Sequence, residues 1–424
     1  RSRIIYTLLM LVVVRIGTQL PVPGVNGSYF SEWFSGNSGS AFGFFDAITG
    51  GSFEKMSVFA LNITPYITSS IIIQLLTIAI PKLEELQKDG EEGRKKMTAI
   101  TRYLTVALAL MESLAMAIGF GRSGLLIKFN ALNVITAVVT LTAGSTVIMW
   151  IGERITENGV GNGISIVLTI NIISRIPQDL TLLFEQFVKG KEIAFQVLNL
   201  AIIIAIIIIV TVLTVALQGA ERRIPVQYSR KVQGRKQVGG QTSHIPLKVN
   251  TAGVIPIIFA QSLFMFPLII MQLLGKSGGN GIGGTILKML NQSNWCDFNE
   301  PIYSIGLIVY IALVIAFAYF YTSITFNPLE IADNMKKQGG FIPGIRPGKP
   351  TSEYLTKILN YIIFIGAVGL VIVAVIPIFF EGAFNASISF GGTSLIIIVG
   401  VIIETLKQIE SRMLVRNYKG FLND

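Results

Sequence analysis

Long hydrophobic runs recur along the whole chain, and most charged residues lie in the segments between them. A helix of about 20 apolar residues crosses a hydrocarbon core of roughly 30 Å. Runs of this kind predict ten spans, near 4–21, 58–80, 101–120, 131–151, 162–180, 194–217, 251–274, 303–325, 356–379 and 390–410. The pattern therefore predicts an all-α polytopic membrane protein with ten transmembrane helices.

A large soluble protein with buried helices is the alternative, and it would require a polar face on each helix. The run AIIIAIIIIVTVLTVAL (201–217) has no such face. Composition agrees, because 51% of the residues are hydrophobic, 14% are charged and the mean hydropathy is +0.64. These values lie far from those of an average soluble domain.

Basic residues predict the orientation of the chain in the membrane. Most of the 34 Lys and Arg residues fall before the odd-numbered spans or in the C-terminal tail. Loops rich in Lys and Arg remain in the cytoplasm. We therefore expect a multi-pass protein with both termini in the cytoplasm.

The connection near 181–193 divides the predicted spans into five and five. An odd number of spans in each half makes the second half enter from the opposite face, as in inverted repeats. We expect an N-terminal half at 1–180, an external hinge at 181–193 and a C-terminal half at 194–424. Folds of this kind place their functional path between the halves.

Polar residues interrupt the second span, in the segment NITPYITSS. On a helix, Ile63, Ile67 and Ile71 fall at i, i+4 and i+8 and form one apolar stripe. Asn62 and Ser69 lie off this stripe, where hydrogen-bonding side chains can join neighbouring helices. The span therefore predicts a helix inside the protein rather than one surrounded by lipid.

Few residues are available for catalysis. His244 is the only histidine and Cys296 the only cysteine, so a histidine-based metal site or triad and an internal disulfide are excluded. The GKS at 275–277 is no phosphate-binding loop, because Ile270 stands where its first glycine is needed. We expect no catalytic residue, no metal and no cofactor.

The ionisable residues that we expect deep within the predicted spans are Arg15, Glu112 and Glu404, which are spread over three different spans. Ion-coupled transporters instead keep paired charges deep in the membrane. We therefore expect a pathway that is apolar at its narrowest point. An apolar constriction gates by dewetting and imposes little chemical selectivity.

Two predicted cytoplasmic loops, 218–249 and 326–357, are long and rich in Lys and Arg. Their charge could serve only to fix the topology and attract anionic lipid. Glycines at 234, 239 and 240 divide the first loop into short extended pieces. This favours a surface presented to an acidic or phosphate-rich partner, a class that includes RNA.

Six segments carry a more specific signal: PYITSSIIIQLL (65–76), GEEGRKKMTAITRY (90–103), GERITENGVGNGISI (152–166), HIPLKVNTAGVIPIIFAQS (244–262), FNPLEIADNMKKQGGFIPGIRPGKPT (326–351) and FGGTSLII (390–397). In this order they resemble the SecY family, the large subunits of the bacterial Sec protein-conducting channel. The resemblance runs from end to end of the chain.

The resemblance implies two inverted five-helix halves that open like a clamshell around a central hourglass pore. A ring that seals such a pore would fall on Ile63, Ile67, Leu168, Ile258, Ser262 and Ile397. A plug at about 42–56 would include Phe44, Phe45, Ile48 and Phe53. Partner docking would fall on Arg235, Lys236 and Arg346.

The function that the resemblance implies is passage of unfolded secretory polypeptides across the bacterial cytoplasmic membrane, with lateral release of hydrophobic segments. The SecA ATPase or the ribosome would drive it, and SecE-type and SecG-type small subunits would assemble with the chain. The chain itself would be a passive channel rather than an enzyme. The alternatives are a five-plus-five secondary transporter for a small solute and a lipid-modifying enzyme or insertase.

Overall fold

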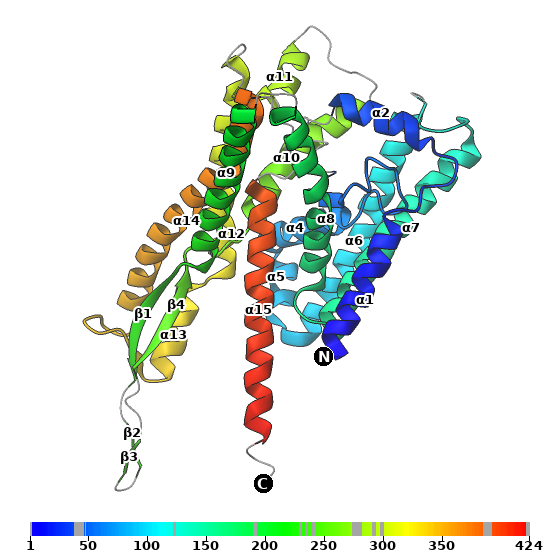
Figure 1. Ribbon diagram of the computed structural model, residues 1–424. Helices are drawn as coiled ribbons and strands as arrows, with labels where there is room; N and C mark the ends of the chain where they lie inside the picture. Colours follow the sequence, from blue (N-terminus) through cyan, green and yellow to red (C-terminus); the bar gives the residue numbers. More distant parts are fainter. Residues whose placement is uncertain are drawn as a thin grey trace.

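The computed structural model describes residues 2–37, 46, 48–121, 124–189, 193–228, 231–233, 236–238, 242–273, 282–290, 294–296, 301–384 and 392–420. Helices dominate these residues, as Figure 1 shows. Those before residue 190 are α1 (Ser2–Gly17), α2 (Gly27–Asn37), α4 (Thr64–Ala79), α5 (Pro81–Lys88), α6 (Gly90–Gly119), α7 (Ala131–Asn158) and α8 (Gly163–Phe187).

The later part of the chain repeats this helical character. Its helices are α9 (Ile193–Gly219), α10 (Ile255–Leu273), α11 (Ile282–Leu290), η3 (Pro301–Ser304), α12 (Ile305–Thr325), α13 (Pro328–Lys337), α14 (Lys349–Phe384) and α15 (Gly392–Gly420). Each predicted span overlaps one helix. Among the described residues, six helical segments are long and apolar enough to cross a membrane, or seven if the bent pair α4–α5 counts as one. The number of ten crossings therefore stays a prediction.

The second predicted span, 58–80, begins later than expected. Residues 57–63 form turns, and α4 starts at Thr64 with Pro65 in its first turn. Proline is suited to this position because its missing N–H has no partner in a first turn. A 110° bend then separates α4 from α5, where Pro81 opens the second helix.

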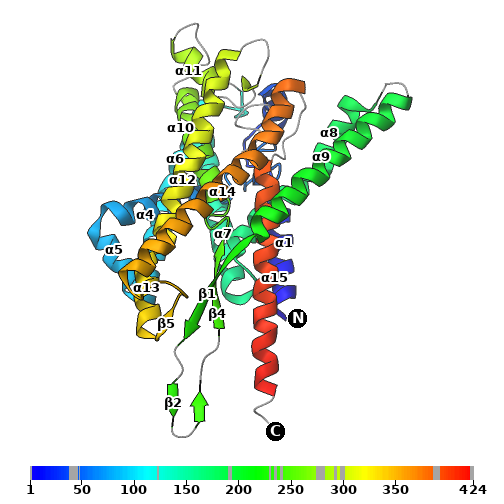
Figure 2. The ribbon, with the colours of Figure 1, turned by 90° about the vertical axis from the view of Figure 1, so that its left-hand side faces the viewer.

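The expected hinge at 181–193 is shorter than predicted, because α8 continues to Phe187. Leu183 is buried on this extension, and Ile203 and Ile207 of α9 pack against it. This apolar contact keeps the chain helical beyond residue 180. Figure 2 shows α8 and α9 side by side, projecting away from the other helices.

A small sheet interrupts the otherwise all-α fold and occupies the two basic loops. Strand β1 (Glu221–Tyr228) pairs antiparallel with β4 (Thr242–Lys248) and with β5 (Gly340–Phe341). We call β1, β4 and β5 the docking sheet. The short strands β2 (Lys231–Gln233) and β3 (Lys236–Val238) pair farther along the hairpin. The extended pieces expected in 218–249 are therefore confirmed as strands.

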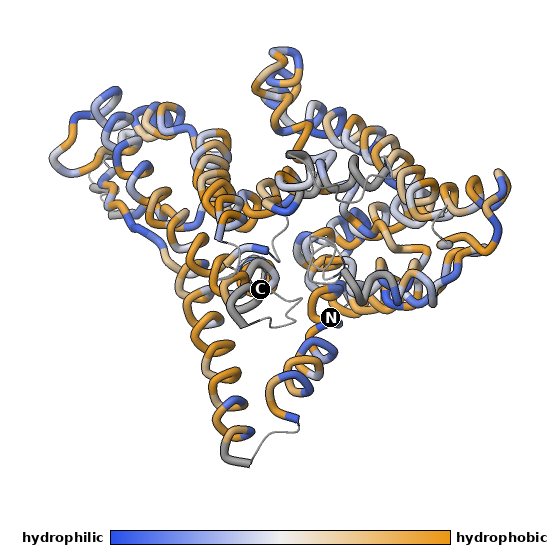
Figure 3. Tube along the Cα trace, turned by 90° about the horizontal axis from the view of Figure 1, so that it is seen from above, coloured by the Kyte–Doolittle hydropathy of each residue, from blue (hydrophilic) through white to orange (hydrophobic). Residues whose placement is uncertain are grey.

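Buried apolar side chains form separate clusters in the two parts of the chain. One cluster joins α2, α6, α7 and the turns before α4, and another joins α9, α10, α12, α14 and α15. Both termini lie at the same end of the molecule as the docking sheet, and α11 lies at the opposite end (Figures 1 and 2). Hydrophobic positions predominate along the helices seen from above in Figure 3.

Candidate functional site

A third apolar cluster lies where the two parts of the chain meet, and we call it the junction cluster. It draws residues from α1, α4, α7, α8 and α15. Its buried members are Val14, Ile48, Phe59, Ile63, Ile148, Ile151, Ile155, Val167, Leu168, Ile172, Ile397 and Ile398. Ile67 is partly buried against it. It therefore contains four of the six residues predicted for the pore ring.

Three of these ring residues lie at or near the N-terminus of a helix, which determines their positions. Ile63 is the residue immediately before α4, and its carbonyl oxygen accepts a hydrogen bond from the N–H of Ile67, one turn later. Leu168 lies in the second turn of α8, whose first turn is capped by the side chain of Asn162. Ile397 lies in the second turn of α15. Their side chains offer no hydrogen-bonding atom, so they can exclude water without selecting a ligand.

The two ring residues predicted on α10 are not part of the junction cluster. Ile258 and Ser262 are both partly buried. The Ser262 hydroxyl donates to the carbonyl oxygen of Ile258 at 2.8 Å, so its polarity is satisfied within its own helix. Val254, four residues before Ile258, does pack against the junction cluster.

The predicted plug residues separate into two environments, and Phe44 and Phe45 lie outside the described residues. We call Asp46 and residues 48–56 the plug segment. Ile48 belongs to the junction cluster. Phe53 points elsewhere and meets Phe30 of α2 edge-on, with ring centroids 5.2 Å apart. The plug segment is therefore anchored to α2 and also contributes to the junction cluster.

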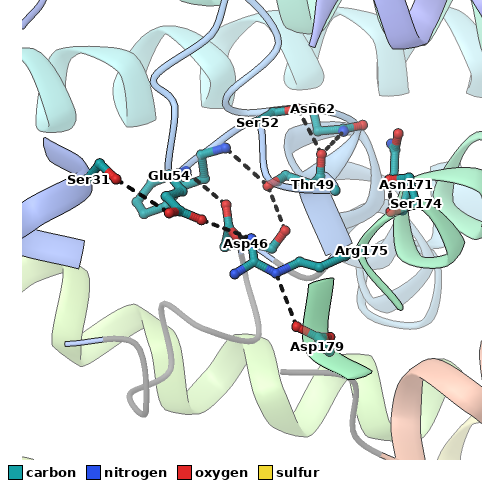
Figure 4. Close-up of polar contacts among 12 residues, drawn as sticks. Ser31, Asp46, Thr49, Ser52, Glu54, Asn62, Asn171, Ser174, Arg175 and Asp179 are labelled. Atoms are coloured by element: carbon teal, nitrogen blue, oxygen red, sulfur yellow. Dashed lines mark hydrogen bonds and ion pairs between the residues drawn. The ribbon is translucent and has the colours of Figure 1, made fainter. Parts of the chain in front are cut away.

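Buried charges join the plug segment to α8, as Figure 4 shows. The guanidinium of Arg175 pairs with the carboxylate of Asp46, with Glu54 at 3.2 Å and with Asp179 at 3.7 Å. The side chains of Asp46 and Asp179 are fully buried, and that of Arg175 is 7% exposed. Asp46 also accepts a hydrogen bond from the N–H of Glu54 at 2.8 Å. We call these four residues the plug latch.

The plug latch corrects the expectation that Arg15, Glu112 and Glu404 are the only ionisable residues within spans. Arg175 and Asp179 lie on α8 at i and i+4, a spacing that places both side chains on one helix face. That spacing was readable from the sequence. Their pairing with Asp46 and Glu54 was not, because more than 120 residues separate Arg175 from each.

Arg15 also contacts the plug segment. Its guanidinium donates to the carbonyl oxygen of Gly50 at 3.4 Å. Gly50 and Gly51 have φ values of +69° and +80°, a left-handed turn that glycine adopts readily. A Cβ at Gly50 would lie 2.8 Å from the carbonyl oxygen of Asn171, so α8 approaches this turn closely.

Asn62 connects the plug segment to the start of α4. Its side-chain amide donates to the carbonyl oxygen of Thr49 at 3.2 Å, and its side-chain oxygen accepts from the N–H of Ile63 at 2.8 Å. Its own carbonyl oxygen accepts from the hydroxyl of Ser145 on α7. Asn62 and Ser69 therefore bond to neighbouring segments, as expected, since Ser69 donates to the carbonyl oxygen of Thr101 on α6.

Two of the three predicted docking residues, Lys236 and Arg346, lie beyond the strands of the docking sheet. Arg346 is exposed in the loop after β5, between glycines with φ values of +84° and +101°. Lys236 begins β3, and Arg235 lies outside the described residues. The buried core beneath the docking sheet joins β1, β4, α13 and α14. The two basic loops therefore form one packed unit.

Within the described residues, no group of three His, Cys, Asp or Glu side chains is arranged to hold a metal ion. The three carboxylates of the plug latch each form an ion pair with the guanidinium of Arg175. Removing one partner of a buried ion pair typically costs about 3–5 kcal/mol, because the other charge is left unpaired. The latch is thus suited to holding two segments together.

Comparison with known proteins matches residues 57–406 to a sequence model of the SecY family. "Protein translocase subunit SecY" of Streptomyces scabiei is 44% identical, covering 100% of this chain and 97% of its own. The protein of the same name from Bacillus subtilis (strain 168) is 41% identical with the same coverage.

Solved structures share the fold at lower identity. "The structure of a protein conducting channel" matches with a TM-score of 0.64 and 19% identity, over 97% of this chain and 92% of that one. "Sec61 in the Canine ribosome-channel complex from the endoplasmic reticulum" matches with a TM-score of 0.64, 18% identity and the same coverage. The family model and the full-length relatives together place this chain in the SecY family.

Proposed function

We propose that this chain forms a protein-conducting channel that moves unfolded polypeptides across the bacterial cytoplasmic membrane and releases hydrophobic segments into it. The junction cluster is the observation that carries the proposal. It brings Ile63, Ile67, Leu168 and Ile397 together with Ile48 of the plug segment. An aliphatic constriction of this kind excludes ions at rest and can fit around any polypeptide side chain.

The two halves, near 1–180 and 194–424, part at the junction cluster when a substrate enters. The cluster contains residues of α4, α7 and α8 from the first half and α15 from the second. Helices α6 and α10 contact each other on another side of the same boundary. Separation of these two helices opens the lateral path by which a signal sequence reaches lipid.

Energy comes from a partner, so the chain acts as a passive channel and SecA or the ribosome supplies the driving force. The docking sheet and the exposed Arg346 present the cytoplasmic surface for this contact. The location of both termini at the same end supports cytoplasmic termini. SecE-type and SecG-type subunits complete the complex, and anionic lipid binds the basic loops.

The solute-transporter alternative predicted a charged site within the spans. The plug latch is a buried charged site, so buried charge does not distinguish the two functions. The full-length relatives named as translocase subunits favour the channel.

The test uses proteoliposomes that contain this chain with its small subunits, supplied with SecA, ATP and a secretory precursor. We expect the precursor to become protected from protease only when ATP and a signal sequence are both present. A precursor with a deleted signal sequence is the control. Absence of protection in an intact complex with an active motor would refute the proposal.

A further inference from the structure

The plug latch differs from the rest of the plug's contacts in being charged and buried. Ile48 and Phe53 hold the plug segment through apolar contacts, which are non-directional. Asp46 instead meets Arg175 and also accepts the N–H of Glu54, so it fixes both the position and the fold of this segment. Three carboxylates surround one guanidinium in this arrangement.

The partners come from elements that must separate when the pore opens. Arg175 and Asp179 belong to α8, which also carries Leu168 of the junction cluster. Asp46 and Glu54 belong to the plug segment. A plug that leaves the pore must therefore break the Arg175–Asp46 and Arg175–Glu54 pairs, while Arg175–Asp179 can persist on α8 because it is an i,i+4 pair.

We infer that Arg175 is a specificity-determining residue of this channel, which acts by holding the plug segment through Asp46. The latch sets how strongly a substrate must interact with the channel before the plug is released. A strong signal sequence supplies enough binding free energy to shift the equilibrium to the open state, whereas a weak one does not. This inference rests on the proposed function and deepens it.

Two substitutions weaken the latch by different routes. Asp46→Asn removes the charge that faces Arg175, but the amide oxygen can still accept the N–H of Glu54, so the fold of the plug segment is retained. Arg175→Met removes the guanidinium that three carboxylates share, which is the more disruptive change. Asp46→Asn therefore decides the question if Arg175→Met fails to assemble.

A matched control lies just beyond the end of the same helix. Lys189 forms an ion pair with Glu185 at 3.2 Å, also at i,i+4, but its side chain is 68% exposed. Exposed pairs of this kind contribute little to stability. Lys189→Gln therefore changes a charge near the end of α8 without affecting the plug segment.

The experiment measures resting ion conductance of the assembled complex in planar bilayers, and export of a precursor with a weakened signal sequence. We expect Asp46→Asn to raise both by about tenfold, the factor that corresponds to about 1.4 kcal/mol in an open–closed equilibrium. We expect Lys189→Gln to match the wild type. Adding Asp46→Asn to Arg175→Met should raise conductance and export by a smaller factor than Asp46→Asn does in the wild type. Both changes break the same Arg175–Asp46 pair, so their effects do not add.

The inference would be overturned if conductance and export in Asp46→Asn stay within about twofold of the wild type, since a tenfold change is expected. The same holds for Arg175→Met if that variant assembles. Export of a precursor with an intact signal sequence is measured in the same preparation. If the wild-type channel fails that assay, the proposed function is refuted. If it succeeds and Asp46→Asn is unchanged, only the latch is refuted.

Discussion

At the scale of single residues, we predict that side chains of the junction cluster form the seal, and Ile67 is the most informative of them. It packs against the cluster but is only partly buried, so a change there reaches the pathway with limited damage to the core. Ile63, by contrast, is fully buried and precedes the first turn of α4.

Ile67→Asn is expected to raise resting ion conductance several-fold, because an amide in an apolar constriction lowers the free energy of hydrating it. Export of precursors with defective signal sequences should rise in parallel. Ile78→Asn is the control, since Ile78 lies on the same helix but is exposed on the outside of the protein. Equal conductance of Ile67→Asn and the wild type would remove Ile67 from the seal.

Glu54 tests the electrostatics of the plug latch. Burial raises the pKa of its carboxyl above the ordinary value of 4.5, although a hydrogen bond from Ser31 acts in the opposite direction. The negative charge of Asp179, which lies on the same guanidinium, raises this pKa further. The closed state thus binds this proton more tightly than a released plug does.

Because the pKa of Glu54 is raised, its protonated form favours the closed state. This stabilisation is fully present below about pH 4.5, the ordinary pKa, and is lost as the pH rises through the raised pKa. Wild-type resting conductance should therefore increase with pH across that window. Glu54→Gln mimics the protonated form, so its conductance should stay low and depend less on pH. A variant with the same pH profile as the wild type would contradict the assignment.

At the scale of helices, small and hydroxyl residues set how closely neighbouring segments approach. The Thr105 hydroxyl on α6 donates to that of Ser69 on α4 at 2.9 Å. Gly144 of α7 lies directly against the backbone of Val58, and a Cβ there would overlap the Val58 carbonyl oxygen. Because backbone cannot yield as a flexible side chain does, this contact fixes where α7 meets the turns before α4.

Gly144→Ala is expected to destabilise the protein by about 1–3 kcal/mol, as overpacking a tight contact does. Thermal unfolding in detergent would report this as a lower midpoint. Gly219→Ala at the end of α9 is the control, because no atom lies within 4 Å of the added Cβ. Ala is also the better helix former, so the control should be neutral or slightly stabilised. An unchanged midpoint for Gly144→Ala would show that α7 can shift freely.

For the whole molecule, the pairing of β1 with β5 joins two loops that are far apart in sequence. Gln227 pairs with Phe341 and Tyr228 with Gly340. Their shared core beneath the sheet packs the two loops into a single unit. Arg346 lies exposed beside this joint.

Arg346→Glu is expected to reduce partner-driven translocation by about tenfold or more, because a reversed charge repels an acidic or phosphate-rich surface. Thermal stability should be unchanged, since the side chain is exposed. Lys82→Glu, an exposed reversal on α5, is the control for net charge. Normal translocation by Arg346→Glu at low and high salt would exclude Arg346 from docking.

The positions of the helices could be predicted from the sequence, because membrane helices satisfy their backbone hydrogen bonds locally and need only a long apolar run. The division of the first basic loop into short extended pieces was also predictable, because glycines at 234, 239 and 240 interrupt it. Helix ends were predicted less accurately from the local sequence. Helix α4 begins only at Thr64, with Pro65 in its first turn, and the contact of Leu183 with α9 extends α8 beyond residue 180. Those ends depend on turns and on packing against other helices.

The membrane class, the helical segments and the apolar character of the predicted ring residues follow from local composition and were therefore readable from the sequence. Which of these residues meet depends on how the helices pack: Ile63, Ile67, Leu168 and Ile397 gather in the junction cluster, while Ile258 and Ser262 lie outside it. The tertiary structure also pairs Arg175 with Asp46 across 129 positions of sequence. Contacts over such separations depend on how the helices pack, and no local pattern encodes them.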